Sequence, residues 1–317
     1  MTRLPLTQAQ CAALTWELDA RNPLIGPPWP SPVIADPTVL PPEETPDQRW
    51  HLIAHSLLGI HHFVSDDGVD WDSRRTLRRN ALRAHLTRIS EGEYALLMEK
   101  PRLMVPIGPL PWRSVIQSQQ SHDLSTWTRP VTVLEPSLAW HHEPGRGSAV
   151  GNPCLIRVEE GWRLYYSAGL VFLEDCGFCE PRWIGLAEAP ALTGPWVPRP
   201  EPLLGTDSVA TLGAGAIKVY PVLDGYVGLQ NAITIDDAGG SGSLIRLLVS
   251  DDGIDWVAPD LPPIVRPGMA PWMNSHVYAL DVAVHEGSVF LYFNARDDWH
   301  WRRGREHIGR AAARLPG

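Results

Sequence analysis

Five segments of this chain repeat one pattern, and the repetition constrains the fold more than any single residue does. Each segment opens on an acidic turn signal and continues into a strand-like run, and the copies are DQRWHLIAHS (47–56), EGEYALLMEK (91–100), EGWRLYYSAG (160–169), DGYVGLQNAI (224–233) and EGSVFLYFNA (286–295). Turns that contain Asp or Gly between strand-like runs are typical of β-hairpins. The chain is therefore expected to consist of repeated hairpins.

A second phrase, which ends in tryptophan, follows four of the five segments. It reads SDDGVDW (65–71), SHDLSTW (121–127), APALTGPW (189–196) and SDDGIDW (250–256). The tryptophans recur roughly every 60 residues, and a long period built of strands and turns is typical of a propeller. Each blade is a small sheet that must pack on its neighbours. We predict an all-β, five-bladed β-propeller with an axial pocket, and one domain over residues 1–317.

The last repeat lacks its own tryptophan phrase. It ends in REHIGRAAA (305–313), which parallels PRWIGLAEA (181–189) as an outer strand. A complete fifth blade is therefore expected at the C-terminus. The four recurring tryptophans are predicted to be structural, because a catalytic residue would not recur once per blade.

Composition excludes several classes of partner. The net charge of −9 and the pI near 5.7 argue against binding to nucleic acid or to an anionic membrane. No stretch is apolar and long enough to cross a bilayer, and the N-terminus lacks the apolar core of a secretory signal, which predicts a cytoplasmic protein. The cysteines are then expected to be free thiols, with a metal or redox pair at C-x-x-C (176–179) as the alternative.

Aligning the five repeats places one polar residue at the same point of each strand. This column consists of His55, Glu99, Ser167, Asn231 and Asn294. Such a ring suits the mouth of a central channel, where a propeller binds its ligand. The alternative is that these side chains form hydrogen bonds between blades.

A second column comes from the innermost strand predicted for each blade. It consists of Asp36, Arg83, Asn152, Ala216 and Tyr278. Asp36 is the only carboxylate in it, and it precedes a proline that fixes how the strand enters. An Asp before Pro also simply starts many strands or turns.

These motifs resemble a known group of enzymes. The ADPTVL segment (35–40), the strand ending at His55 and the S-x-D-G-x-x-W phrases are similar to the five-bladed glycosidases of glycoside hydrolase family 43. Families 32, 68 and 117 share that fold. The resemblance implies a general base at Asp36, a second Asp in blade two and a general acid Glu in blade three. Here blade two offers Arg83-Ala84-His85 and blade three offers Asn152-Pro153 at those points.

Two other glutamates are candidates for the missing acid. Glu180 lies in DCGFCEPRWIG (175–185), predicted to be a loop between strands, where it either serves the site or pairs with Arg182. Glu99 is followed by Lys100 and Arg102, which would lower its pKa and suit substrate binding better. An acid and a base roughly 6.5–9.5 Å apart are the minimum for an inverting hydrolysis.

The remaining candidates are substrate-binding residues. Arg113 follows a tryptophan at the start of an alternating strand, where it faces either the mouth or another blade. The resemblance also implies that His276, at the start of blade five, lies near an axial calcium. The full set of predicted binding residues is His55, Arg83, His85, Arg113, Asn152, Arg182, Asn231, His276 and Asn294.

Three functions fit these features. The first is an inverting glycosidase that acts on a small glycoside, furanoside or oligosaccharide, with Asp36 as the base. The second is a non-hydrolytic propeller enzyme, such as a cyclase or isomerase, that uses the same pocket. The third is a propeller that binds carbohydrate without catalysis. Fold alone does not choose between them.

Overall fold

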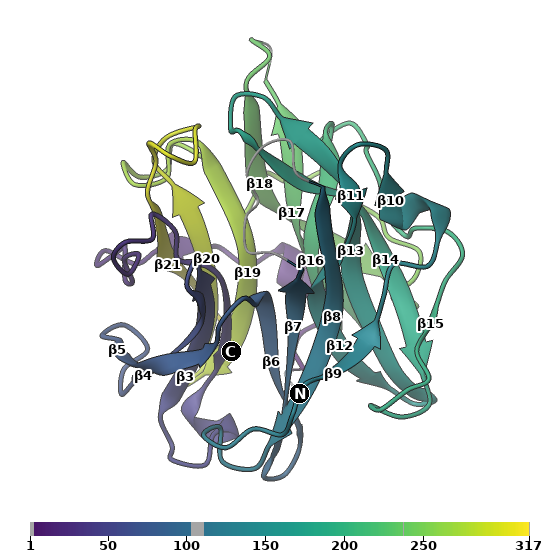
Figure 1. Cartoon of the computed structure of the whole chain (residues 1–317). Coiled ribbons are helices and arrows are strands. Elements are labelled where there is room, and N and C mark those ends of the chain that lie inside the picture. The colour runs from purple at the N-terminus through teal and green to yellow at the C-terminus, as the bar shows by residue number, and fades with distance from the viewer. Residues whose placement is uncertain (1–2, 103–110, 237, 317) are drawn as a thin grey trace.

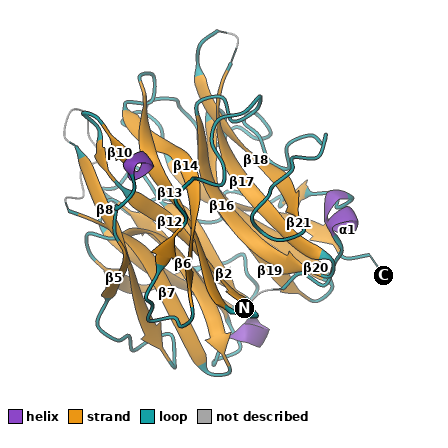
Figure 2. Ribbon diagram, turned by 90° about the vertical axis from the view of Figure 1, so that its right-hand side faces the viewer, coloured by secondary structure: helices purple, strands orange, loops and turns teal. Residues whose placement is uncertain are grey.

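The computed structural model describes residues 3–102, 111–236 and 238–316. Within these ranges, strands dominate, and the helices are one short α-helix, α1 (Gln8–Ala12), and two single 3₁₀ turns, η1 (Pro42–Glu44) and η2 (Ala139–His141). The strands form five antiparallel blades around a central axis (Figures 1 and 2). No helix in the described part of the chain is long and apolar enough to span a membrane.

Each blade runs outward from the axis in chain order. Blade one consists of β2 (Ala35–Leu40), β3 (Trp50–Ser56), β4 (Gly59–Ser65) and β5 (Asp72–Arg78). Blade two consists of β6 (Leu82–Ser90), β7 (Glu93–Pro101), β8 (Trp112–Ser121) and β9 (Val131–Leu134), with β10 (His142–Glu143) and β11 (Gly147–Ser148) beside β8. Blade three consists of β12 (Val150–Val158), β13 (Gly161–Leu173), β14 (Phe178–Ala189) and β15 (Val197–Pro198).

The last two blades join into one continuous sheet. Blade four consists of β16 (Gly213–Val222), β17 (Gly225–Ile235) and β18 (Ser241–Ser250), and blade five of β19 (His276–His285), β20 (Ser288–Arg296), β21 (Glu306–Arg314) and β1 (Glu17–Leu18). A single parallel pair, Ser243 with His276, connects them. The innermost strands β2, β6, β12, β16 and β19 contact one another in that cyclic order, which closes the ring.

The fifth blade is not completed by the C-terminus as expected. The REHIGRAAA segment forms β21, the third strand of the blade, and the N-terminal strand β1 adds the fourth by antiparallel pairing of Glu17 with Ala312. The two ends of the chain therefore share one sheet. The sequence pattern missed β1 because it has only two residues.

The apolar core lies between the blades. Each recurring tryptophan packs on an apolar cluster formed by its own blade and the preceding blade. Trp71 packs between blades five and one, and Trp127 packs between blades one and two. Trp196 packs between blades two and three, and Trp256 packs between blades three and four. All four are half-buried rather than fully buried. They close the outer end of each interface.

The phrase before the tryptophan docks one blade on the next. In blade one, Oδ1 of Asp67 accepts hydrogen bonds from the backbone N–H groups of Val69 (2.9 Å) and Asp70 (2.8 Å), which folds the turn. The carbonyl oxygen of Gly68 accepts a hydrogen bond from the Tyr292 hydroxyl of blade five (2.7 Å). Gly68 has a φ of +71°, and a Cβ there would lie 2.7 Å from that hydroxyl oxygen, so the position requires glycine.

Blade four repeats this contact. Tyr165 of blade three donates to the carbonyl oxygen of Gly253 at 2.8 Å, and Gly253 has a φ of +74°. The two SDDG copies of the motif thus make the same docking contact.

Candidate active site

The ring of polar residues ties each blade to the next. Ser167 donates to the carbonyl oxygen of Gly215 (2.6 Å), Asn231 donates to that of Val277 (2.7 Å), and Oδ1 of Asn294 accepts from the backbone N–H of Asp36 (2.9 Å). These three contacts link blade three to four, four to five and five to one. The hydrogen-bonding interpretation of the ring therefore holds for these side chains.

His55 and Glu99, the first two members of the ring, also contact the next blade. The ring of His55 lies 3.4 Å from the backbone nitrogen of Arg83 in blade two. The carboxylate of Glu99 packs directly on Gly151 in blade three, where a Cβ would collide with it. Three of the five, His55, Asn231 and Asn294, also line the axial pocket.

The predicted inner column lines one cavity of about 130 Å³. Its wall includes Asp36, Arg83, Asn152, Ala216 and Tyr278, one from each blade. An engineered cavity of roughly 150 Å³ holds a benzene ring, so this pocket has room for one ring-sized group. The structure brings the whole column together, although its members lie far apart in the sequence.

The first three column residues share an unusual backbone. Asp36, Arg83 and Asn152 have φ values of 51°, 50° and 47°, and each lies at an irregularity in the pairing of its strand with the next. Positive φ is costly for a residue with a side chain, above all for Arg. A β-bulge re-aims a side chain, and such strain clusters at functional sites. Here the bulges bring three polar residues to the pocket.

Asp36 is held as a carboxylate. Its Oδ2 lies 3.1 Å from Nδ1 of His55, and its side chain is 15% exposed. The same ring nitrogen lies 3.4 Å from the backbone N–H of Arg83, so Asp36, His55 and Arg83 meet at one point. Burial alone would raise the pKa of Asp36, but the hydrogen bond from His55 and the positive charges of His55, Arg83 and Lys218 lower it below the ordinary value.

Glu180 faces the same pocket, but its surroundings favour the protonated form. It is 5% exposed and lines the cavity. Burial raises the pKa of Glu180 to about 8, against the lowering effect of Arg83 and Arg296, while the charges of Asp36 and Glu306 raise it further. In the described part of the chain it has no ion pair within 4 Å.

The position of Glu180 corrects the sequence prediction. Glu180 lies within strand β14, paired with Val171 of β13, and not in a loop. β13 and β14 continue past the neighbouring strands and end in a turn around Asp175 and Cys176. This extension of the hairpin carries Glu180 to the pocket.

Arg83 is fixed from behind by Glu99. Its Nη1 donates to Oε2 of Glu99 at 3.0 Å, and Oε1 of the same carboxylate accepts from Nε1 of Trp112 at 2.8 Å. Glu99 is 1% exposed, whereas Arg83 and Trp112 both line the pocket. Glu99 therefore orients two pocket residues and does not itself reach a ligand.

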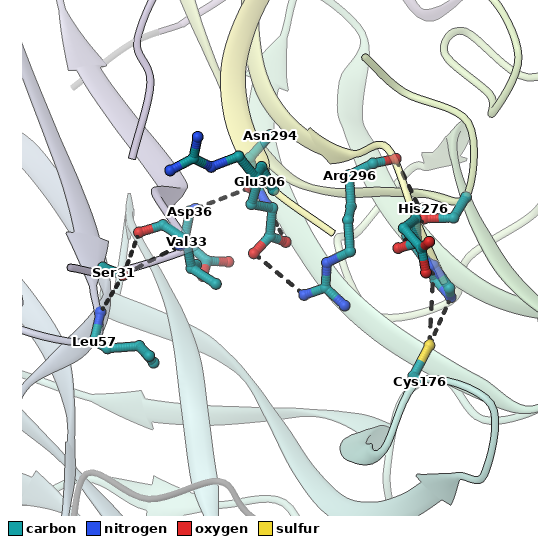
Figure 3. A network of polar contacts seen from close by, with 12 residues as sticks. Ser31, Val33, Asp36, Leu57, Cys176, His276, Asn294, Arg296 and Glu306 are labelled. Atoms are coloured by element: carbon teal, nitrogen blue, oxygen red, sulfur yellow. Dashed lines mark hydrogen bonds and ion pairs between the residues drawn. The ribbon is translucent and has the colours of Figure 1, made fainter. Parts of the chain in front are cut away.

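A second ion pair, missed by sequence reasoning, closes the pocket from blade five. Nη2 of Arg296 lies 3.3 Å from Oε2 of Glu306, and Oε1 of Glu306 accepts from Nδ2 of Asn294 at 3.1 Å (Figure 3). The guanidinium of Arg296 lies over the rings of Phe178 (4.9 Å) and Tyr278 (5.4 Å). Burial raises the pKa of Glu306, and the charge of Asp36 adds to this effect.

Four predicted binding residues do not line the pocket: His85, described below, and Arg113, Arg182 and His276. Arg113 is exposed, and its neighbour Trp112 faces the cavity instead, since successive residues of a strand point to opposite faces. Arg182 lies 3.8 Å from Glu143, so it pairs with neither the site nor Glu180. His276 is fully buried, with Nε2 3.2 Å from the sulfur of Cys176 (Figure 3).

An axial calcium does not fit the described residues. His276 contacts Cys176 and stacks on Tyr278, and no group of three or more His, Cys, Asp or Glu side chains in the described ranges could hold a metal. This also argues against a metal at C-x-x-C. The four cysteines are free, as expected.

The axis below the pocket holds a lysine. Nζ of Lys218 donates to Nδ1 of His85 at 2.9 Å, and His85 therefore lies beneath the pocket rather than on its wall. The positive charge of Lys218 would repel a metal cation at this depth. The sequence held a signal for it, because Lys218 is one of two lysines in the chain and interrupts the apolar run GAIKVYPV (215–222).

The other missed residues had weaker signals. The NARDD run (294–298), which contains Arg296, is an inward candidate in the sequence, whereas Glu306, which opens the last strand next to Arg305, is not. Charged residues at strand ends are common, so nothing in the sequence paired Arg296 with Glu306. Their burial against one another is visible only in the fold.

No protein-family model and no curated protein matches this chain. Solved structures match it in fold. The catalytic domain of the Coprinopsis cinerea GH62 alpha-L-arabinofuranosidase aligns with a TM-score of 0.67 at 12% identity, covering 95% of this chain and 98% of that one. A thermostable family-43 glycoside hydrolase aligns with a TM-score of 0.62 at 13% identity, covering 87% and 88%.

The chain has the fold of the five-bladed propeller glycosidases. This confirms the predicted fold and the predicted resemblance at the level of architecture. An N-acetylgalactosamine deacetylase from F. plautii shares the fold too, with a TM-score of 0.65 at 14% identity and 95% of each chain covered. Enzymes with different reactions thus share this architecture, so the function of this chain has to be inferred from its site residues.

Proposed function

We propose that this protein is an inverting glycoside hydrolase that acts on a small glycoside or furanoside, with Asp36 as general base and Glu180 as general acid. One observation carries the proposal: of the three carboxyl groups that line the pocket, Asp36 and Glu180 have pKa values displaced in opposite directions, and the third, Glu306, is paired with Arg296. Pairs of titratable groups displaced in this way mark acid and base assignments.

The two states suit the two roles at neutral pH. Asp36, whose pKa is lowered, is ionised and can take a proton from water. Glu180, with a pKa of about 8, keeps its proton and can give it to the leaving oxygen. The pocket thus separates the two functions by environment. Burial decides the direction of the pKa shift at Glu180, whereas at Asp36 the hydrogen bond from His55 and the nearby positive charges together outweigh burial.

Arg83 is coupled to both proposed catalytic carboxyls. It lines the same pocket as Asp36 and Glu180, and although burial lowers the pKa of Arg83, the charges of Glu99, Asp36 and Glu180 raise it above the ordinary value. Inversion requires the acid and the base to lie roughly 6.5–9.5 Å apart, so that a water molecule fits between the base and the sugar.

The buried, perturbed carboxyls favour an enzyme over a non-catalytic binding propeller, because ionisable groups are placed in such surroundings at a cost. The solved structures of similar fold include one in complex with a blood group B trisaccharide. This agrees with a sugar as the ligand. A cyclase or isomerase would use the same carboxyls without releasing a sugar.

The test is a panel of nitrophenyl glycosides and furanosides, followed by proton NMR of the first product formed. Release of a sugar with inverted anomeric configuration supports the proposal. Retention would exclude Asp36 as a base acting through water. A lack of turnover on every member of the panel would favour the non-hydrolytic alternative.

A further inference from the structure

Lys218 lies on the propeller axis, below the pocket. It belongs to strand β16 of blade four and is 8% exposed. Its ammonium donates to Nδ1 of His85 (2.9 Å) and to the carbonyl oxygen of Pro153 (3.3 Å). His85 belongs to blade two, which is not a neighbour of blade four. Side chains of these two blades can touch only where all blades converge.

The partners of this ammonium are neutral. His85 accepts from Lys218 through Nδ1, so its proton is on Nε2, which lies 3.3 Å from the carbonyl oxygen of Leu155. Among the described residues no carboxylate lies within 4 Å of Lys218. A buried ammonium without a counter-charge is costly. A nearby negative charge would offset this cost.

Two carboxylates are close enough to the axis to be considered. Asp281 already accepts four hydrogen bonds, from the Thr38 and Tyr220 hydroxyls and from two backbone N–H groups. Its charge is therefore stabilised by its own donors. Asp36 is the other, and Lys218 is one of the charges that act on it.

A hollow of about 10 Å³ lies between the pocket floor and Lys218. Asp36, Arg83, Asn152, Lys218 and Asn231 all contribute to its wall. A space of this size holds about one water molecule when it offers two to four polar partners. Asp36 and Lys218 thus face one hollow that fits a bridging water.

We propose that Lys218 is a positioning residue for Asp36: its ammonium, fixed on the axis by His85 and Pro153, acts across this one-water hollow and keeps the Asp36 carboxylate ionised and in place. The role as a base rests on the proposed function, whereas the charge coupling does not. Removal of Lys218 should therefore change the titration of Asp36 whether or not the protein hydrolyses glycosides.

The other groups that face Asp36 set the size of the effect. The cations are His55 on β3 and Arg83 on β6, and the carboxyls are Glu180 on β14 and Glu306 on β21. His55 and Arg83 remain when Lys218 is replaced, so the pKa of Asp36 should rise without reaching that of a buried, unpaired acid. Lys218 is the weakest of the charges that lower the pKa of Asp36. We therefore expect a rise that is measurable by titration but smaller than the rise that loss of His55 or Arg83 would cause.

The experiment titrates Asp36 by carbon NMR of protein labelled at the aspartate carboxyls, with Asp36→Asn identifying the resonance. Lys218→Met removes the charge and the donor, and Lys218→Gln removes the charge but keeps a donor for His85. Lys100→Met is the matched control, because Lys100 is the other lysine and, among the described residues, its ammonium donates to the carbonyl oxygen of Asn80 (2.7 Å) and forms no ion pair.

A higher Asp36 pKa in both Lys218 variants, with no change in Lys100→Met, supports the proposal. An unchanged pKa in both would overturn it, even if the protein proves to be a glycosidase. A rise in the Met variant alone would also overturn it, since the lost hydrogen bond would then be the cause. If the Met variant does not fold, the Gln variant decides. Where turnover is measurable, the acid limb of kcat/KM should move in step.

Discussion

Replacing Glu180 by Gln should remove the proton donor while keeping the shape of the side chain. Glu180 is almost fully buried and its pKa is about 8, whereas its ordinary value is 4.5. At pH 7 a group with that raised pKa is about 90% protonated, and a group with the ordinary value is less than about 1% protonated. The fold thus supplies an acid that the same residue in water could not supply.

The size of the effect depends on the leaving group. General acid catalysis contributes roughly 10²–10⁴-fold. Glu180→Gln should lose this factor on an alkyl glycoside, whose leaving oxygen needs a proton. It should lose much less on a dinitrophenyl glycoside, whose anion leaves unaided. The basic limb of the wild-type kcat/KM profile should fall near pH 8 and be absent from the variant.

The same carboxyl predicts a pH dependence of stability. Its pKa is raised on folding, so its contribution is fully present below the unfolded value of about 4.3 and is lost as the pH rises through about 8. A displacement of three to four pH units corresponds to about 4–5 kcal/mol at the alkaline end. Glu180→Gln should therefore melt higher than the wild type at pH 8–9, and the gap should close toward pH 4.

Thermal melts from pH 4 to pH 9 test this without any substrate. The control is Glu160→Gln, because Glu160 is exposed in the turn between β12 and β13 and should change stability little at any pH. Equal activity losses on both leaving groups, together with parallel stability curves for the variant and the wild type, would refute the assignment of Glu180 as a buried acid.

Three other outcomes follow from the structure. Asp36→Asn should still fold, with a lower melting temperature because the positive charges around Asp36 lose their partner, while turnover falls roughly 10²–10⁴-fold; full activity would exclude Asp36 as the base. Trp256→Ala should cost about 2 kcal/mol by urea unfolding, below the roughly 3–5 kcal/mol of a fully buried tryptophan, and should leave kcat unchanged. Trp112→Ala should weaken substrate binding, measured by titration calorimetry, whereas Arg113→Ala should not, because only Trp112 faces the pocket; equal effects would contradict that orientation.

The architecture could be predicted from the repeats, because each turn and strand is encoded by a short segment of neighbouring residues. A turn and a strand pattern recur in each blade, a tryptophan phrase recurs in four, and the copies at Gly68 and Gly253 make the same contact for the same reason. The same alignment placed Asp36, Arg83 and Asn152 on the axis, since equivalent positions of a symmetric ring must converge. The sequence did not show which of two neighbouring residues faces the pocket: Arg113 was the candidate, whereas Trp112 lines it.

Only the tertiary structure decided the state of each charged group. The pKa of Glu180 depends on burial beneath residues of other blades, and the pairing of Arg296 with Glu306 depends on the register between β20 and β21. The contact of Lys218 with His85 joins blades that are not adjacent, so no repeat pattern could reveal it. The sequence repeats show which positions converge on the axis. The protonation state of each side chain depends instead on the burial and charge of the non-repeating residues around it.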